Sequence, residues 1–230
     1  MILKVAAVLG LVFSVGAFSA NIMGKVNFKG TAPKMDALKM NSDPYCAKEN
    51  AGKTVLKEEV VVNSNGTLEN VFVYVKEGVK NPPPVTAEAI TIDQHGCKYK
   101  PHVMGVRVNQ PFKILNSDPT MHNIHGLPKL NNQFNHGMPT KGQVIEKKFT
   151  KAENGIKIKC DVHGWMLSYL NVVDHPFFAV TDDKGSFTIK DLPPGDYTLE
   201  AWHEKFGTQT AKIKVPDSMK PVEFTFGGQG

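Results

Sequence analysis

The stretch Ile156–Met166 constrains this chain more than any other, because an alternating strand ends there in a short loop that carries three metal-binding side chains. Isoleucines alternate with lysines up to Cys160, as in a strand with one face against a core. His163 and Met166 follow on the loop, so a thiol, an imidazole and a thioether can face one point. This mixture of ligands suits a copper ion that changes between two oxidation states.

A fourth metal ligand must come from elsewhere in the chain. The strand-like run Phe112–Leu115 breaks into a polar turn that holds His122, Asn123 and His125. A strand that ends in such a turn places its polar side chains at the edge of a sheet. We take His122 as the fourth ligand.

These two elements together resemble the cupredoxins, which combine a Cys-x-x-His-x-x-Met loop with an upstream His-Asn-x-His element at a similar separation. The resemblance covers residues 85–175 and implies a Greek-key β-sandwich with one type 1 blue copper site. It implies that His122, Cys160 and His163 are the trigonal ligands and that Met166 is the weak axial ligand.

The resemblance also assigns roles around the metal. It implies that Asn123 is an outer residue that ties the two ligand loops together. It places His163 at the solvent-facing edge, with Trp165 and Leu167 as its apolar surroundings, so this edge is the expected electron port. The expected partner is a redox protein, such as a cytochrome or a copper oxidoreductase.

Structural zinc is the main alternative for the metal. One sulfur and three nitrogens could close a tetrahedron around zinc, from Cys160, His163, His122 and His125. Met166 argues for copper, because zinc does not recruit thioethers whereas a blue copper site uses one as its long axial contact. We interpret His125 as a packing side chain near the site.

A second metal site is an open alternative around His95 and His102, which flank a cluster near Cys97. Histidines at a surface or in hydrogen bonds are the more common case. We therefore expect no metal there.

The first twenty residues have the three-part layout of a secretory signal. Lys4 precedes the apolar run Val5–Phe13, and small residues follow as far as Ala20. The apolar run is too short to span a bilayer. We expect residues 1–20 to be a signal peptide and the protein to be soluble and periplasmic or otherwise exported.

Three cysteines in an exported chain fit one metal thiolate and one disulfide. We therefore predict a disulfide between Cys46 and Cys97, which leaves Cys160 for the metal. Asp43 and Pro44 read as the N-cap and first position of a short helical turn that carries Cys46.

Charge and motifs narrow the class of function. The formal net charge is +5 with scattered lysines, which does not suggest nucleic acid but could steer docking to an acidic redox partner. No nucleophile with a partnered base and no phosphate loop is evident, so we do not predict an enzyme. Two other functions remain open: copper handling, as a carrier or scavenger, and a wall- or partner-binding module in which the metal is structural.

The C-terminal part carries a second strand pattern. Turns at 182–185 and at the Leu-Pro-Pro-Gly-x-Tyr sequence of residues 192–197 separate short alternating runs. These signatures resemble the carboxypeptidase regulatory-like domains, which are small transthyretin-like β-sandwiches. We interpret Trp202 as a core residue of this sandwich and His203 as a residue of its rim.

The opening strand of that family has a Gly-x-Val pattern, which here lies far upstream at Gly24-Lys25-Val26. We therefore expect an all-β chain in which a cupredoxin domain, residues 84–175, is inserted in a discontinuous sandwich of residues 21–83 plus 176–230. The run Asn81–Pro84 marks the stiff connection between them.

Overall fold

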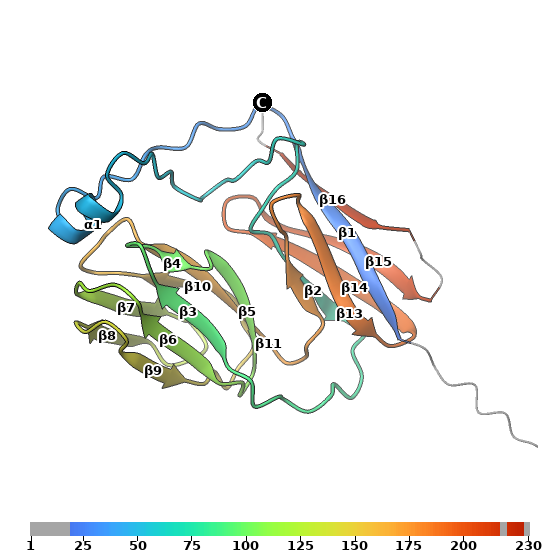
Figure 1. Cartoon of the computed structure of the whole chain (residues 1–230). Helices are drawn as coiled ribbons and strands as arrows, with labels where there is room; N and C mark the ends of the chain where they lie inside the picture. Colours follow the sequence, from blue (N-terminus) through green and yellow to red (C-terminus); the bar gives the residue numbers. More distant parts are fainter. Residues whose placement is uncertain (1–18, 217–219, 228–230) are drawn as a thin grey trace, which may run out of the picture.

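The computed structural model describes residues 19–216 and 220–227 of the chain (Figure 1). The predicted signal peptide lies almost entirely in residues 1–18, outside the described part. Among the described residues, no helix has the length and apolar character needed to cross a membrane.

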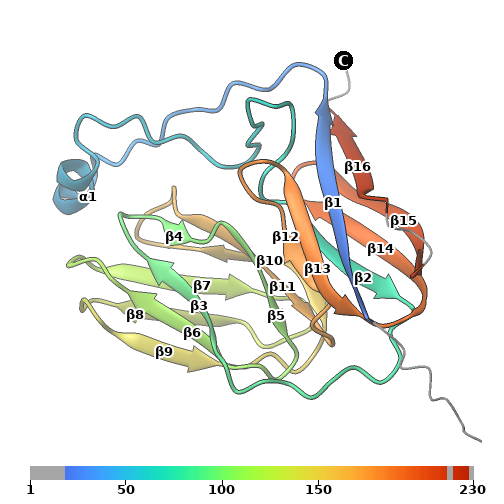
Figure 2. The ribbon, with the colours of Figure 1, turned by 45° about the vertical axis from the view of Figure 1, so that its right-hand side comes forward.

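The described chain is built almost wholly of β-strands. It contains sixteen strands in four sheets and one short helix, α1 (Pro44–Glu49). The sheets form two sandwiches that lie side by side in both views (Figures 1 and 2). The predicted all-β fold class is confirmed.

The first sandwich combines the start of the chain with its end. One sheet has the order β13-β1-β16, from Ser186–Leu192, Ala20–Lys29 and Val222–Gly227. The other has the order β12-β2-β14-β15, from Phe178–Val180, Phe72–Glu77, Gly195–His203 and Gly207–Val215. Strand β1 runs antiparallel to β13 and parallel to β16.

The alternation in β1 shows which of its faces packs against the core. Ile22, Gly24 and Val26 face the core, while the residues between them face outwards. A Cβ atom on Gly24 would lie 2.2 Å from the Phe187 ring, so only glycine lets β13 approach β1 this closely. Each large apolar side chain buried in this core contributes about 1.5–3 kcal/mol.

The second sandwich is formed by the middle of the chain. Its larger sheet has the order β5-β11-β10-β7-β8, from Val103–Arg107, Leu167–Val173, Glu153–Lys159, His122–Leu127 and Phe134–Met138. Its smaller sheet has the order β4-β3-β6-β9, from Tyr99–Lys100, Ile90–Gln94, Phe112–Asn116 and Val144–Lys147. Their common core includes Phe112, Ile158 and Leu170, and Cys160 and Met166 belong to the same cluster.

The chain passes from one sandwich to the other before β3 and returns after β11. The guanidinium of Arg107 donates hydrogen bonds to the carbonyl oxygens of Pro83 and Pro84 on the outward connection and of Asp174 on the return. Phe72 of the first sandwich also packs in one cluster with residues of the second. Both crossings are therefore held at one place.

A long excursion between β1 and β2 covers one end of the second sandwich. We call residues 36–59 the cap. Figures 1 and 2 show the cap leaving the first sandwich and placing α1 above the far end of the second. Asp43 is the N-cap of α1 and accepts a hydrogen bond from the Cys46 N–H at 2.8 Å, and Pro44 occupies the first turn.

The predicted disulfide between Cys46 and Cys97 is confirmed. It joins α1 of the cap to the turn before β4. Both cysteines are fully buried, together with Met40. The disulfide therefore fixes the cap on the second sandwich.

The interpretation of the end of β14 was wrong, because the two roles are reversed. His203 is only 2% exposed, and its ring stacks on Phe206 with centroids 4.7 Å apart. Trp202 is half-buried and packs at the junction of the sandwiches against Tyr169. Both faces of β14 are covered, so apolar character alone does not identify the inner face.

The buried His203 predicts a loss of stability in mild acid. Burial, and to a lesser extent the charge of His102, lowers the pKa of His203 to about 4, against about 6.5 in the unfolded chain. The unfolded chain therefore binds more protons between these two values, so stability is complete above pH 6.5 and is lost as the pH falls towards 4. We expect a loss of about 3 kcal/mol from this residue.

Urea unfolding of the wild type and of His203→Phe at pH 7.5 and pH 4.5 measures this contribution. The phenylalanine retains the aromatic stack but does not titrate, so the variant should lose less stability between the two pH values. An equal loss in both proteins would assign the acid sensitivity to other groups.

Candidate metal centre

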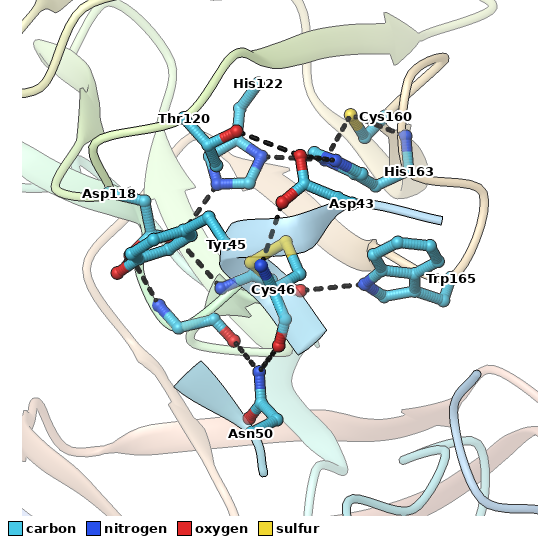
Figure 3. The surroundings of a disulfide bond; sticks show 12 residues. Asp43, Tyr45, Cys46, Asn50, Asp118, Thr120, His122, Cys160, His163 and Trp165 are labelled. Atoms are coloured by element: carbon cyan, nitrogen blue, oxygen red, sulfur yellow. Dashed lines mark hydrogen bonds and ion pairs between the residues drawn. A yellow bond between two sulfur atoms is a disulfide. The ribbon is translucent and has the colours of Figure 1, made fainter. Parts of the chain in front are cut away.

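Three of the four predicted ligands meet in one buried cluster. Candidate metal-binding atoms of His122, Cys160 and His163 all lie within 4.8 Å of one another, and each residue is at most 2% exposed. The two Nδ1 atoms are 3.0 Å apart, and the Cys160 Sγ is 3.9 Å from Nδ1 of His163 (Figure 3). Bonds of about 2.0 Å to nitrogen and 2.3 Å to sulfur can span such separations, so the donor set fits a single cation.

The local structure explains this convergence. His122 begins β7, and Cys160 directly follows β10. The loop then turns back at once: the Met166 N–H donates to the carbonyl of His163 at 2.9 Å, and the Cys160 N–H donates to the carbonyl of Met166 at 3.3 Å. The His163 N–H donates to the Cys160 Sγ at 3.3 Å, which fixes the sulfur inside the turn.

The surroundings favour the thiolate form of Cys160. Burial alone would raise the pKa of this thiol, but hydrogen bonds from His122 and from the backbone N–H groups of His163, Asn123 and Val162 hold it below its usual value. A thiolate is the form that binds metals. The buried site therefore offers a sulfur anion where the two imidazoles meet.

The two histidines differ electrostatically. Burial lowers the pKa of His122, but hydrogen bonds with Asp118 and Cys160 outweigh it and raise the pKa to about 8. Burial lowers the pKa of His163 below its ordinary value. The Asp118 carboxylate stays ionised, because hydrogen bonds from His122 and from the N–H groups of Cys97 and Gly96 outweigh burial and lower its pKa to about 2.

Met166 and Asn123 both lie close to the loop that follows Cys160. Met166 is 1% exposed and belongs to the same core cluster as Cys160. The Asn123 side chain accepts a hydrogen bond from the Asp161 N–H at 2.9 Å and donates to Asn135. Asn123 thus links β7 to the loop that follows Cys160.

The expectation that His163 faces solvent is wrong. The residue is only 1% exposed, because the cap lies over it. Its Nε2 is 3.2 Å from the Oδ2 of Asp43, and its ring packs against Trp165 with centroids 4.9 Å apart (Figure 3). The resemblance that suggested an open edge covers residues 85–175 and does not include the cap.

Trp165 lies between the buried His163 and the surface, and its side chain is half-buried. The indole N–H donates to the carbonyl of Cys97 at 3.0 Å. Trp165 and Met166 also line a cleft of about 810 Å³ between the cap and the second sandwich, together with Leu38, Leu56, Lys98 and Lys157. The half-buried indole therefore connects the buried His163 with the surface.

The other histidines lie apart from this cluster. The His125 Nδ1 is 2.9 Å from the Asp161 Oδ2, and no candidate ligand group of the described residues contains His125, His95 or His102. His102 is buried, with its Nε2 2.5 Å from the Glu204 Oε1. The third nitrogen of the zinc alternative, that of His125, is therefore not brought to the site.

Sequence reasoning missed two residues of the centre, Asp118 and Asp43. Asp118 precedes His122 by four positions in the same polar turn, so its place in the sequence was a usable signal. Asp43 is 120 positions from His163 and was interpreted only as a helix cap. The disulfide prediction was the signal that could have brought it to the site.

Comparisons with known proteins give partial likenesses. Residues 150–220 match the family described as polysaccharide lyase family 4, domain II. No curated protein matches the chain.

Three solved structures resemble part of the chain, each at a low TM-score. A reduced mutant of amicyanin is 24% identical, with a TM-score of 0.33, and the match covers 38% of this chain and 85% of that one. A purple cupredoxin from Nitrosopumilus maritimus is 20% identical, with a TM-score of 0.31, over 36% of this chain and 97% of that one. A copper-containing nitrite reductase from Thermus scotoductus is 19% identical, with a TM-score of 0.32, over 43% of this chain and 25% of that one.

Proposed function

We propose that this protein is an exported type 1 copper protein that carries electrons between redox partners and is not an enzyme. The observation that supports the proposal is the buried convergence of two imidazole Nδ1 atoms and a thiol whose pKa is held low. His122, Cys160 and His163 would hold the ion, with Met166 as the axial ligand. Bound copper would supply a one-electron couple at this place.

The residues around the ion would keep its geometry nearly constant. His122 and Cys160 are attached to strands, and the loop bearing His163 is closed by its own backbone hydrogen bonds. A site held this firmly changes little when its charge changes, and small reorganisation makes electron exchange fast. Trp165 is the candidate route for electrons, because it contacts His163 and lines the cleft.

We propose that residues 84–175 form the copper domain and that residues 21–83 plus 176–230 form a second, carboxypeptidase regulatory-like sandwich. The pairing of β1 with β13 and β16 supports this division, as do the two separate cores. The buried disulfide supports export to an oxidising compartment such as the periplasm. A cytochrome or another copper protein is the proposed partner.

An optical spectrum of the copper-loaded protein tests the proposed function. We expect an intense visible charge-transfer band that bleaches on reduction and returns on oxidation, because a thiolate bound to cupric ion absorbs visible light. The zinc-loaded protein is the control and should be colourless. A colourless protein that binds only cuprous ion would overturn electron transfer in favour of copper handling.

A further inference from the structure

In each histidine of the centre, the ring nitrogen Nε2, which points away from Cys160, contacts a carboxylate. The Nε2 of His122 is 2.9 Å from the Asp118 Oδ2, and the Nε2 of His163 is 3.2 Å from the Asp43 Oδ2 (Figure 3). The side chains of Asp118 and His122 are completely buried, and that of Asp43 is 17% exposed. With both Nε2 atoms engaged, each imidazole presents Nδ1 to the other and to Cys160.

The backbone N–H groups of the two disulfide-bonded cysteines position both carboxylates. The Cys46 N–H donates to the Asp43 Oδ1 at 2.8 Å, and the Cys97 N–H donates to the Asp118 Oδ2 at 2.7 Å. The Thr120 hydroxyl completes the contacts of Asp43 at 2.9 Å. Asp118 also accepts from the Gly96 N–H at 2.8 Å and the Tyr45 hydroxyl at 3.2 Å. Neither carboxylate can turn away without leaving several donors unpaired.

We propose that Asp43 and Asp118 are positioning residues of the metal centre, fixed by the Cys46–Cys97 disulfide, that orient both imidazoles and stabilise the more highly charged oxidation state of the bound copper. This inference rests on the proposed function. A carboxylate on the outer nitrogen of a ligand histidine fixes the ring and makes it a stronger ligand. A buried negative charge also favours cupric over cuprous ion, because salt screens it little.

The variant Asp43→Asn tests the role of the Asp43 carboxylate. Asparagine is as good an N-cap as aspartate, so this change removes the charge and leaves α1 capped. Cupric affinity should fall by about 10–100-fold, cuprous affinity should fall less, and the reduction potential should rise. Asp118→Asn should act in the same direction, and Asp43→Asn remains informative if the fully buried Asp118 variant does not fold.

The control is Glu49→Gln, which removes an exposed carboxylate from the same helix without touching either histidine. It should leave both affinities and the potential unchanged. Equal losses of cupric and cuprous affinity in Asp43→Asn, with an unchanged potential, would overturn the inference and leave Asp43 with a structural role only. A wild type without the visible band would instead refute the proposed function, so the two failures are distinguishable.

Discussion

The copper-loaded Cys160→Ser variant is expected to lose the intense visible absorption completely. The band requires a thiolate bound to cupric ion, and Cys160 is the only cysteine outside the disulfide. Metal affinity should fall by more than the roughly 100-fold that changes to outer residues typically cause, because serine stays protonated where cysteine ionises. Absorption spectroscopy and competition with a chelator measure the two effects.

The matched control for this experiment is His125→Ala. His125 lies on β7 opposite Lys159 of β10, its Nδ1 contacts the Asp161 carboxylate, and it is outside the candidate ligand group. It should retain the band and bind copper about as well as the wild type. A band that survives in Cys160→Ser would refute the ligand set, and a large loss of affinity in His125→Ala would favour the zinc tetrahedron.

Removal of the disulfide should have the largest effect on stability. The double variant Cys46→Ser with Cys97→Ser opens a link between residues 51 positions apart. The chain-entropy relation predicts a loss of about 4 kcal/mol in the free energy of unfolding for a loop of this length. Urea unfolding of the metal-free protein measures the loss without a contribution from bound metal.

The oxidised and reduced wild type provide the comparison for the double variant. Reduction of the disulfide should lower stability by a similar amount, since it removes the same link. A loss below about 1 kcal/mol in both cases would mean that packing and hydrogen bonds alone hold the cap. The relation describes the unfolded chain, so such a result would also imply residual structure there.

The parts of the centre that lie close together in sequence were the most predictable. Cys160, His163 and Met166 lie on one short loop, whose length leaves few ways for the side chains to point. The prediction of His122 required a second element of the chain. His122 was found because it follows the end of the predicted strand Phe112–Leu115. The pairing of β10 with β7 then brings the two elements to one sheet.

The cap could not be predicted to cover the site. The contact between Asp43 and His163 joins residues 120 positions apart, and nothing in the local pattern around Asp43 points to His163. For this reason the solvent-facing edge inferred for His163 was wrong. The predicted roles of Trp202 and His203 were wrong for another reason. Both faces of β14 are covered, so no polar face shows which residues point into the core of the sandwich.

Because the cap contributes Asp43, residues 84–175 do not contain the whole candidate metal centre. A fragment cut at Pro84 and His175 would retain Cys160 and both histidine ligands but would lose Asp43 and the partner of Cys97. The released Cys97 thiol lies in a group with His122 whose candidate ligand atoms are within 4.8 Å of one another. Such a fragment would offer a second free thiol beside His122, in a candidate group with Asp118 that does not include Cys160, so this group would compete for metal with the one that contains Cys160.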